Sequence, residues 1–205
     1  FDNDDYIIFF GQGPHVWDYD EDQFVYKKNI YTDTTYYFIS FDSGLGKRID
    51  NLPHNYTLGD PTEADPVTSY DTYFIHEQDD INLVNTGRQW FGESFAFDSN
   101  QNFETPIQNW LNDTVILKAN LAARSSVTSM FEFSSGSTNI GNISISSVSS
   151  SSNTYYNSSI LVQSFLPNLD YSTISINYNN NGNGSALAWL DYFSLQGRAS
   201  LDVNA

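Results

Sequence analysis

Alternating carboxylates near the N-terminus have the residue types of a metal site. Asp18, Asp20 and Asp22 occupy every second position, and carboxylate oxygens are the ligands that calcium prefers. The usual calcium loop continues with glycine at its sixth position and glutamate at its twelfth, where this chain has Gln23 and Asn29. The run therefore predicts a solvated acidic turn, with a calcium site as the alternative and the one cofactor that the sequence leaves open.

The residue types for nucleophilic catalysis are sparse. The chain has no cysteine and three histidines, it lacks the Gly-x-Ser-x-Gly turn of serine hydrolases, and its histidines do not have the spacing of a zinc site. Acidic residues are frequent enough to supply a glycosidase pair, but they cluster in turns, where solvated charge is their ordinary role. We expect no catalytic residue in this chain.

Aromatic rings offer a second possible chemistry, because exposed rings can lie flat against sugars. Trp110, Tyr155 and Tyr156 are the candidates for ligand-facing rings, and Trp90 and Trp189 are also available. A β-sandwich buries large rings as well, each contributing about 150–250 Å² of area. The apolar run around Trp189 favours a core position for that ring.

Residues 86–93 (TGRQWFGE) combine one basic residue, two large rings and two glycines. The glycines allow a turn or the close approach of another element, and the arginine can stack on a ring or pair with a carboxylate. The segment predicts a structural junction or a partner contact. Its members would be Gly87, Arg88, Trp90, Phe91, Gly92 and Glu93.

Composition and charge exclude several classes of protein. The chain of 205 residues carries 8 basic and 25 acidic side chains, a net charge of −17, which repels a phosphate backbone and excludes nucleic acid as a partner. No run of about 20 apolar residues exists, so no membrane-spanning helix is expected. The absence of cysteine removes disulfides and thiolate metal sites.

The elements that position these residues are predicted to be strands, because β-branched and aromatic residues outnumber strong helix formers. Strands are expected over residues 6–10, 24–27, 35–41, 69–76, 94–98, 114–124, 126–133, 142–148, 159–165, 172–178 and 186–196, and one short helix over residues 106–111. Charge and composition change near residue 92. The fold class is therefore all-β, with an acidic, Tyr-rich subdomain over residues 1–92 and a Ser/Asn-rich antiparallel β-sandwich or jelly roll over residues 93–205.

Four blocks of the sequence resemble a known family: residues 5–17 (DYIIFFGQGPHVW), 29–38 (NIYTDTTYYF), 86–93, and 189–195 with the following Arg198 and Leu201. The chain resembles the cell-surface sortase of the type IX secretion system of Bacteroidetes, a large protein with a gingipain-like cysteine peptidase domain. The family's form of the third block is Ser-Gly-Arg-Glu-Trp-Phe-Gly-Glu, from which this chain departs at Thr86 and Gln89.

The resemblance implies a non-catalytic β region that precedes the peptidase domain, since the family's cysteine nucleophile and histidine base have no counterpart here. Phe1 in place of a start methionine fits an excised piece. The implied partners are the downstream peptidase domain, secreted cargo and components of the secretion system, at the cell surface or outside the cell. The alternative is a carbohydrate-binding β-sandwich of a secreted enzyme.

Overall fold

The structure, a computed structural model, describes residues 8–20, 23–40, 44, 66–85, 88–107, 109–167 and 173–201. All of the regular elements in these ranges are strands, which confirms the all-β prediction. They are β1 (Val16–Asp20), β2 (Gln23–Lys27), β3 (Ser69–Glu77), β4 (Asn100–Glu104), β5 (Val115–Arg124), β6 (Ser129–Ser135), β7 (Thr138–Ile145), β8 (Asn157–Phe165), β9 (Thr173–Asn179) and β10 (Leu187–Ser200). In the described ranges no helix is long and apolar enough to cross a membrane.

Two compact units make up the chain, Phe1–Pro66 and Val67–Ala205. The composition changes near residue 92, but the strand expected over residues 69–76 forms β3 and pairs with β10. The expected change at residue 92 thus falls inside the second unit.

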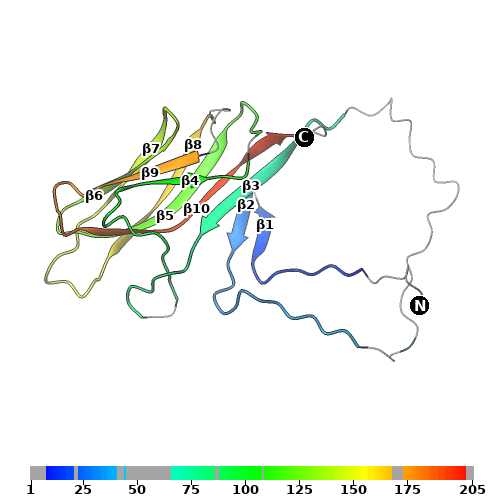
Figure 1. The fold of residues 1–205 in the computed structure, drawn as a ribbon, viewed down its shortest axis with the longest axis horizontal. Coiled ribbons are helices and arrows are strands. Elements are labelled where there is room, and N and C mark those ends of the chain that lie inside the picture. The colour runs from blue at the N-terminus through cyan, green and yellow to red at the C-terminus, as the bar shows by residue number, and fades with distance from the viewer. Residues whose placement is uncertain are drawn as a thin grey trace. The chain divides into compact units, whose positions relative to one another are not determined.

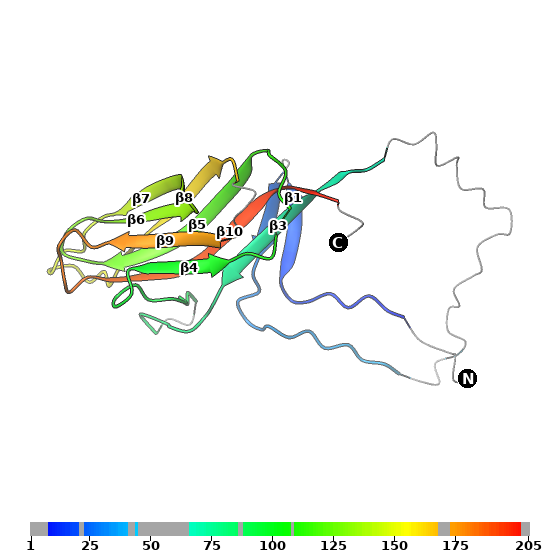
Figure 2. The same cartoon turned by 45° about the horizontal axis from the view of Figure 1, so that its top comes forward.

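The second unit is a sandwich of two four-stranded antiparallel sheets (Figures 1 and 2). The sheet orders are β3-β10-β5-β8 and β4-β9-β6-β7. Counted from β3, the first sheet holds the first, eighth, third and sixth strands and the second sheet holds the second, seventh, fourth and fifth. This is the strand order of a jelly roll, in which hairpin-like connections cross repeatedly from one sheet to the other.

The core lies between the two sheets and follows the two-residue period of the strands. Leu117, Ala119 and Leu121 point inward from β5, and Phe131 and Phe133 point inward from β6; all five are fully buried or nearly so. Burial of each large side chain contributes about 1.5–3 kcal/mol relative to exposure. The intervening residues therefore form the outer faces of the sandwich.

The first unit contains the β1–β2 hairpin, which has two chemically different faces. Trp17 lies opposite Tyr26 and Tyr19 opposite Phe24, with ring centroids 5.0 Å and 5.1 Å apart. Because cross-strand neighbours share a face, these rings form a ladder on one face and the charged side chains lie on the other.

Two strands expected in the first unit do not form over the described residues. Residues 8–10 and 35–40 have no regular secondary structure and belong to no sheet, and the rest of runs 6–10 and 35–41 lies outside the described residues. The rings of Phe9 and Tyr37 have centroids 5.7 Å apart, so side chains join the two segments. High β-propensity does not produce a strand where the backbone has no ladder partner.

Two further expectations in the second unit are wrong. The described residues of 106–111 form no helix, because Leu111 N–H donates to the Arg198 carbonyl at 2.9 Å and Ser200 N–H to the Asn109 carbonyl at 2.8 Å, which ties this segment to β10. The strand expected over residues 94–98 is reduced to a single bridge between Ser94 and Trp189. The strand in this region is β4, which starts at Asn100.

Candidate functional site: a loop anchored on the outer face of one sheet

One edge of the sheet β3-β10-β5-β8 is built from two separate segments. β3 pairs with β10 as far as Glu77 opposite Tyr192. After residues 78–91, pairing with β10 resumes: Gly92 N–H donates to the Leu190 carbonyl at 2.9 Å, and Leu190 N–H donates to the Glu93 carbonyl at 3.0 Å. Residues 78–85 and 88–91, which we call the anchored loop, are thus inserted into the edge of the sheet.

A β-bulge lies at the point where this insertion leaves the sheet. The register of β10 against β5 shifts between Leu190 and Tyr192, which leaves Asp191 as the extra residue. Bulges re-aim side chains and are frequent beside functional sites. Here the bulge brings the Asp191 carboxylate to the outer face, beside the anchored loop.

The base of the anchored loop is closed by backbone contacts. Ile81 and Phe91 exchange two N–H to carbonyl hydrogen bonds, both 2.8 Å long. Gly92 lies so close to Gln78 that a Cβ at Gly92 would be 2.9 Å from the Gln78 Cβ and 3.2 Å from its carbonyl oxygen. Only glycine fits this approach without movement of the backbone.

Phe91 fixes the loop to the sheet. Its side chain is completely buried against Ala122 and Trp189, and its ring meets the Tyr156 ring edge-on with centroids 5.2 Å apart. This cluster is separate from the main core and lies on the opposite side of the same sheet. At this position the sheet is therefore covered on both faces.

A polar network beside Phe91 orients the loop. The Asp191 Oδ2 atom accepts hydrogen bonds from Asn120 Nδ2 at 2.6 Å and from Gln89 Nε2 at 3.2 Å, and the Tyr156 hydroxyl donates to Gln89 Oε1 at 3.0 Å. Burial, with a smaller contribution from the nearby Asp191 carboxylate, raises the pKa of Tyr156. The hydroxyl therefore stays protonated and remains a donor.

His76 and Glu93 join the two segments of the sheet edge. The His76 Nε2 atom lies 2.6 Å from Glu93 Oε1, and both side chains are about four-fifths buried. The His76 ring stacks on Phe193 at a centroid distance of 5.4 Å. Burial by itself would raise the pKa of the Glu93 carboxyl, but the hydrogen bond from His76, a backbone hydrogen bond and the charge of protonated His76 together lower it.

The structure places the predicted junction residues in two groups. Phe91, Gly92 and Glu93 form the base of the anchored loop, whereas Arg88 and Trp90 are exposed, with Trp90 40% accessible. Gly87 lies outside the described residues. Within the described residues Arg88 forms no ion pair with a carboxylate, and Glu93 pairs with His76 through its Oε1 atom.

The expected ligand-facing aromatics differ from one another in burial. Trp110 is only 7% exposed and belongs to the main core. Its assignment as a ligand-facing ring is therefore wrong, because the ring is buried in the apolar interior of the sandwich. Tyr155 and Tyr156 are half-buried on the outer face. The Arg124 guanidinium lies over the Tyr155 ring, 4.4 Å from its centroid.

Sequence reasoning missed three residues of the site. His76, Asn120 and Asp191 come from three different strands, and their meeting depends on strand order and on the bulge. A histidine at the end of a strand and an aspartate inside an apolar run were visible signals, but neither pattern names a partner.

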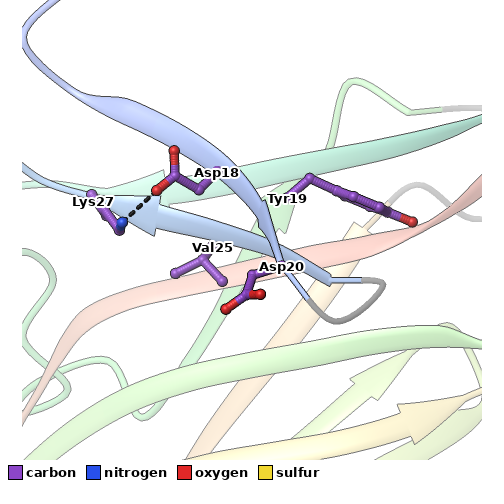
Figure 3. A pocket seen from close by; sticks show the side chains of 5 residues that line it. All are labelled: Asp18, Tyr19, Asp20, Val25 and Lys27. Atoms are coloured by element: carbon purple, nitrogen blue, oxygen red, sulfur yellow. Dashed lines mark hydrogen bonds and ion pairs between the residues drawn. The ribbon is translucent and has the colours of Figure 1, made fainter.

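Two of the three calcium candidates, Asp18 and Asp20, lie on the β1–β2 hairpin (Figure 3). Asp18 forms an ion pair with Lys27, and the hydrogen bond to Asp18 together with its charge raises the pKa of Lys27. The ammonium thus already neutralises Asp18, while Asp20 lines the same shallow pocket. Asp22 lies outside the described residues, which contain no group of three acidic or histidine side chains suited to a metal, so calcium stays a prediction.

Fold and site together define a jelly-roll β-sandwich whose outer face carries an anchored loop. No protein-family model matches the chain, and no curated protein matches it. The crystal structure of dimeric latent PorU from Porphyromonas gingivalis is similar over 66% of this chain at 20% identity, with a TM-score of 0.56. The chain spans 13% of that PorU chain, and the likeness shows a shared fold.

Two other solved structures are more distant. The insecticidal delta-endotoxin Cry8Ea1 from Bacillus thuringiensis is 14% identical over 53% of this chain and 19% of its own, with a TM-score of 0.34. The carbohydrate-binding module CBM36 in complex with calcium and xylotriose is 12% identical over 63% of this chain and 99% of its own, with a TM-score of 0.37. Such low TM-scores do not establish a common fold.

Proposed function

We propose that this chain is the non-catalytic β region of a longer cell-surface protein of the type IX secretion sortase family. In this role it supports a gingipain-like cysteine peptidase domain and contacts cargo or components of the secretion system. The chain has no cysteine, so the nucleophile of such a protein would come from another part of the polypeptide.

One observation carries the proposal: two sequence blocks that resemble the family meet in space. Residues 86–93 and 189–195 are far apart in the sequence, but Gly92 N–H donates to the Leu190 carbonyl oxygen at 2.9 Å and the rings of Phe91 and Trp189 have centroids 6.5 Å apart. Residues from both blocks thus take part in the contact that fixes the anchored loop. The similarity in fold to PorU supports the same proposal independently of these blocks.

The gene tests this proposal most directly. We expect the reading frame that contains these codons to encode, further along, a domain of alternating strands and helices with a histidine and a later cysteine at strand ends. The complete gene product should cleave peptide substrates, and this chain alone should not. A reading frame without a peptidase domain would overturn the proposal.

Carbohydrate binding is a second candidate, favoured by one feature of the site. The exposed Trp90 ring adjoins Gln89, whose amide belongs to the network with Asp191 and Asn120, and rings beside amides and carboxylates suit sugar hydroxyls. Affinity electrophoresis in polysaccharide gels tests this function. Retardation that is lost in Trp90→Ala but kept in Phe97→Ala, a control with another exposed ring, would support sugar binding; no retardation would reject it.

A further inference from the structure

Three of the four basic side chains of the second unit lie on one face, and the fourth belongs to the loop anchored there. Arg88, Lys118, Arg124 and Arg198 are the only basic residues after position 66. In β5, Leu117, Ala119, Leu121 and Ala123 face the core, so Lys118 and Arg124 point outward. Arg198 is exposed on β10 opposite Asp71, and Arg88 belongs to the loop anchored on this face.

Three of these cations form no ion pair with a carboxylate in the described part of the chain. Arg198 pairs with Asp71 at 3.5 Å, whereas Arg124 lies over the Tyr155 ring and both Arg88 and Lys118 are exposed. In a chain of net charge −17, carboxylates are abundant, so cations without such a partner are noteworthy. The acidic side chains of this face, Asp71, Glu77 and Asp191, belong to β3 and β10, and β5 and β8 contain no acidic residue.

Exposed aliphatic side chains lie beside the two cations of β5, on the neighbouring edge strand β8. On β8, Ile160 is 54% exposed and Val162 60% exposed. Ile160 lies opposite Asn120 and Val162 opposite Lys118, so both belong to the outer face. Cross-strand neighbours on one face have Cβ atoms within about 5.5 Å of each other. The aliphatic part of the Lys118 side chain therefore lies beside Val162.

The outer face of the other sheet has a different chemistry. On β6, Phe131 and Phe133 face the core and Glu132 faces outward. Asn177 Nδ2 donates to Glu132 Oε2 at 3.0 Å, and Ser175 Oγ donates to Asn102 Oδ1 at 2.6 Å. These polar groups satisfy one another across the strands, and none of the unit's basic residues lies there.

We propose that the outer face of the sheet β3-β10-β5-β8 docks a protein whose surface presents carboxylates around apolar side chains. The inference rests on the proposed function, because a supporting region needs a contact surface. Arg88, Lys118 and Arg124 pair with the carboxylates, and Ile160, Val162 and Trp90 are covered by the apolar groups. Arginine and tryptophan are enriched among residues that dominate binding energy, and exposed aliphatic groups favour a protein over a glycan.

Fluorescence anisotropy with defined probes tests this surface on the intact chain. The probe is a labelled peptide in which Asp alternates with Leu; its controls alternate Lys with Leu and Asp with Ser. We expect the Asp–Leu peptide to bind at least about 10-fold tighter than either control, a difference of about 1.4 kcal/mol. Its binding should weaken as salt rises, because exposed charges are screened.

Variants locate the binding on the surface. Lys118→Glu, and the pair Ile160→Ser with Val162→Ser, should each weaken binding about 10-fold, equivalent to about 1.4 kcal/mol. Glu132→Lys on the opposite sheet should leave it unchanged. All of these side chains are exposed or half-exposed, and circular dichroism checks that each variant is folded.

Several outcomes would overturn the proposal. They are undetectable binding, equal binding of the Lys–Leu peptide, weakening by Glu132→Lys, and stronger competition by the polyuronate alginate than by unlabelled Asp–Leu peptide. If the peptide binds but the gene encodes no peptidase domain, the docking surface is supported and the proposed sortase role is rejected. If the gene encodes the peptidase domain but the peptide does not bind, the docking surface is rejected and the proposed sortase role stands.

Discussion

At the scale of single residues, Gly92 is the most constrained backbone position of the site. A methyl group there would meet Gln78 at its Cβ and its carbonyl oxygen, at 2.9 Å and 3.2 Å, and neither atom can move without the backbone. We expect Gly92→Ala to lower the free energy of unfolding by about 1–3 kcal/mol. Urea unfolding followed by tryptophan fluorescence measures this change.

Gly184→Ala is the matched control, because nothing lies within 4 Å of the added Cβ. Its effect should stay within about 0.5 kcal/mol. Equal unfolding midpoints for Gly92→Ala and Gly184→Ala would show that residues 78 and 92 do not approach one another as described.

The ion pair of His76 and Glu93 predicts a specific dependence of stability on pH. Because the pKa of the Glu93 carboxyl is lower in the folded chain than its ordinary value of 4.5, the stabilisation is fully present above that value. It is lost as the pH falls through the lowered pKa of the folded state. Unfolding free energies measured between neutral and strongly acidic pH should therefore decrease in this window.

Glu93→Gln isolates this contribution. It removes the charge-assisted hydrogen bond, which costs about 1.5–3 kcal/mol at neutral pH, and the difference from the unchanged chain should shrink on acidification. Glu104→Gln, an exposed carboxyl on β4, is the control and should show a constant, small difference. A gap between Glu93→Gln and the unchanged chain that persists at acidic pH would contradict the ion pair.

At the scale of elements, the anchored loop depends on one ring. Phe91→Ala removes a completely buried side chain, which costs about 3–5 kcal/mol. Since the ring belongs to the outer-face cluster and not to the main core, the loss should fall mainly on the loop. Hydrogen exchange should accelerate at the amides of Ile81 and Phe91 while β6 and β9 stay protected.

Phe97→Ala is the control for this ring, because Phe97 is fully exposed. It should change neither the exchange of the loop amides nor the unfolding free energy by more than about 0.5 kcal/mol. Uniform acceleration of exchange throughout the second unit in Phe91→Ala would show that the loop and the sandwich unfold together.

The strands that the sequence predicted well are those with a buried, alternating face. The pattern around Phe131 and Phe133 indicated β6, because each inward position must be apolar. The sequence did not predict β4 (NQNFE), because Phe103 is its one buried side chain and a single apolar residue makes no alternating pattern. The pairing of Gln89 with Asp191 could not be predicted either, because it requires the strand order and the bulge in β10.

At the scale of the whole molecule, the second unit contains complete hydrophobic clusters of its own. The main core and the outer-face cluster draw all of their members from residues after 66, and the division into compact units falls at Pro66. A unit whose hydrophobic clusters are complete within its own sequence is expected to fold alone.

We therefore expect the piece Val67–Ala205 to be folded and cooperative when produced by itself. Its thermal midpoint should lie within about 4 °C of that of the intact chain, which corresponds to roughly 1 kcal/mol for a domain of this size. Calorimetry measures the thermal midpoint. Near-ultraviolet circular dichroism reports whether the buried rings have fixed packing. A broad, non-cooperative transition with loss of the near-ultraviolet signal would mean that residues 1–66 are needed for packing, and it would replace a free-standing jelly roll with a single interdependent fold.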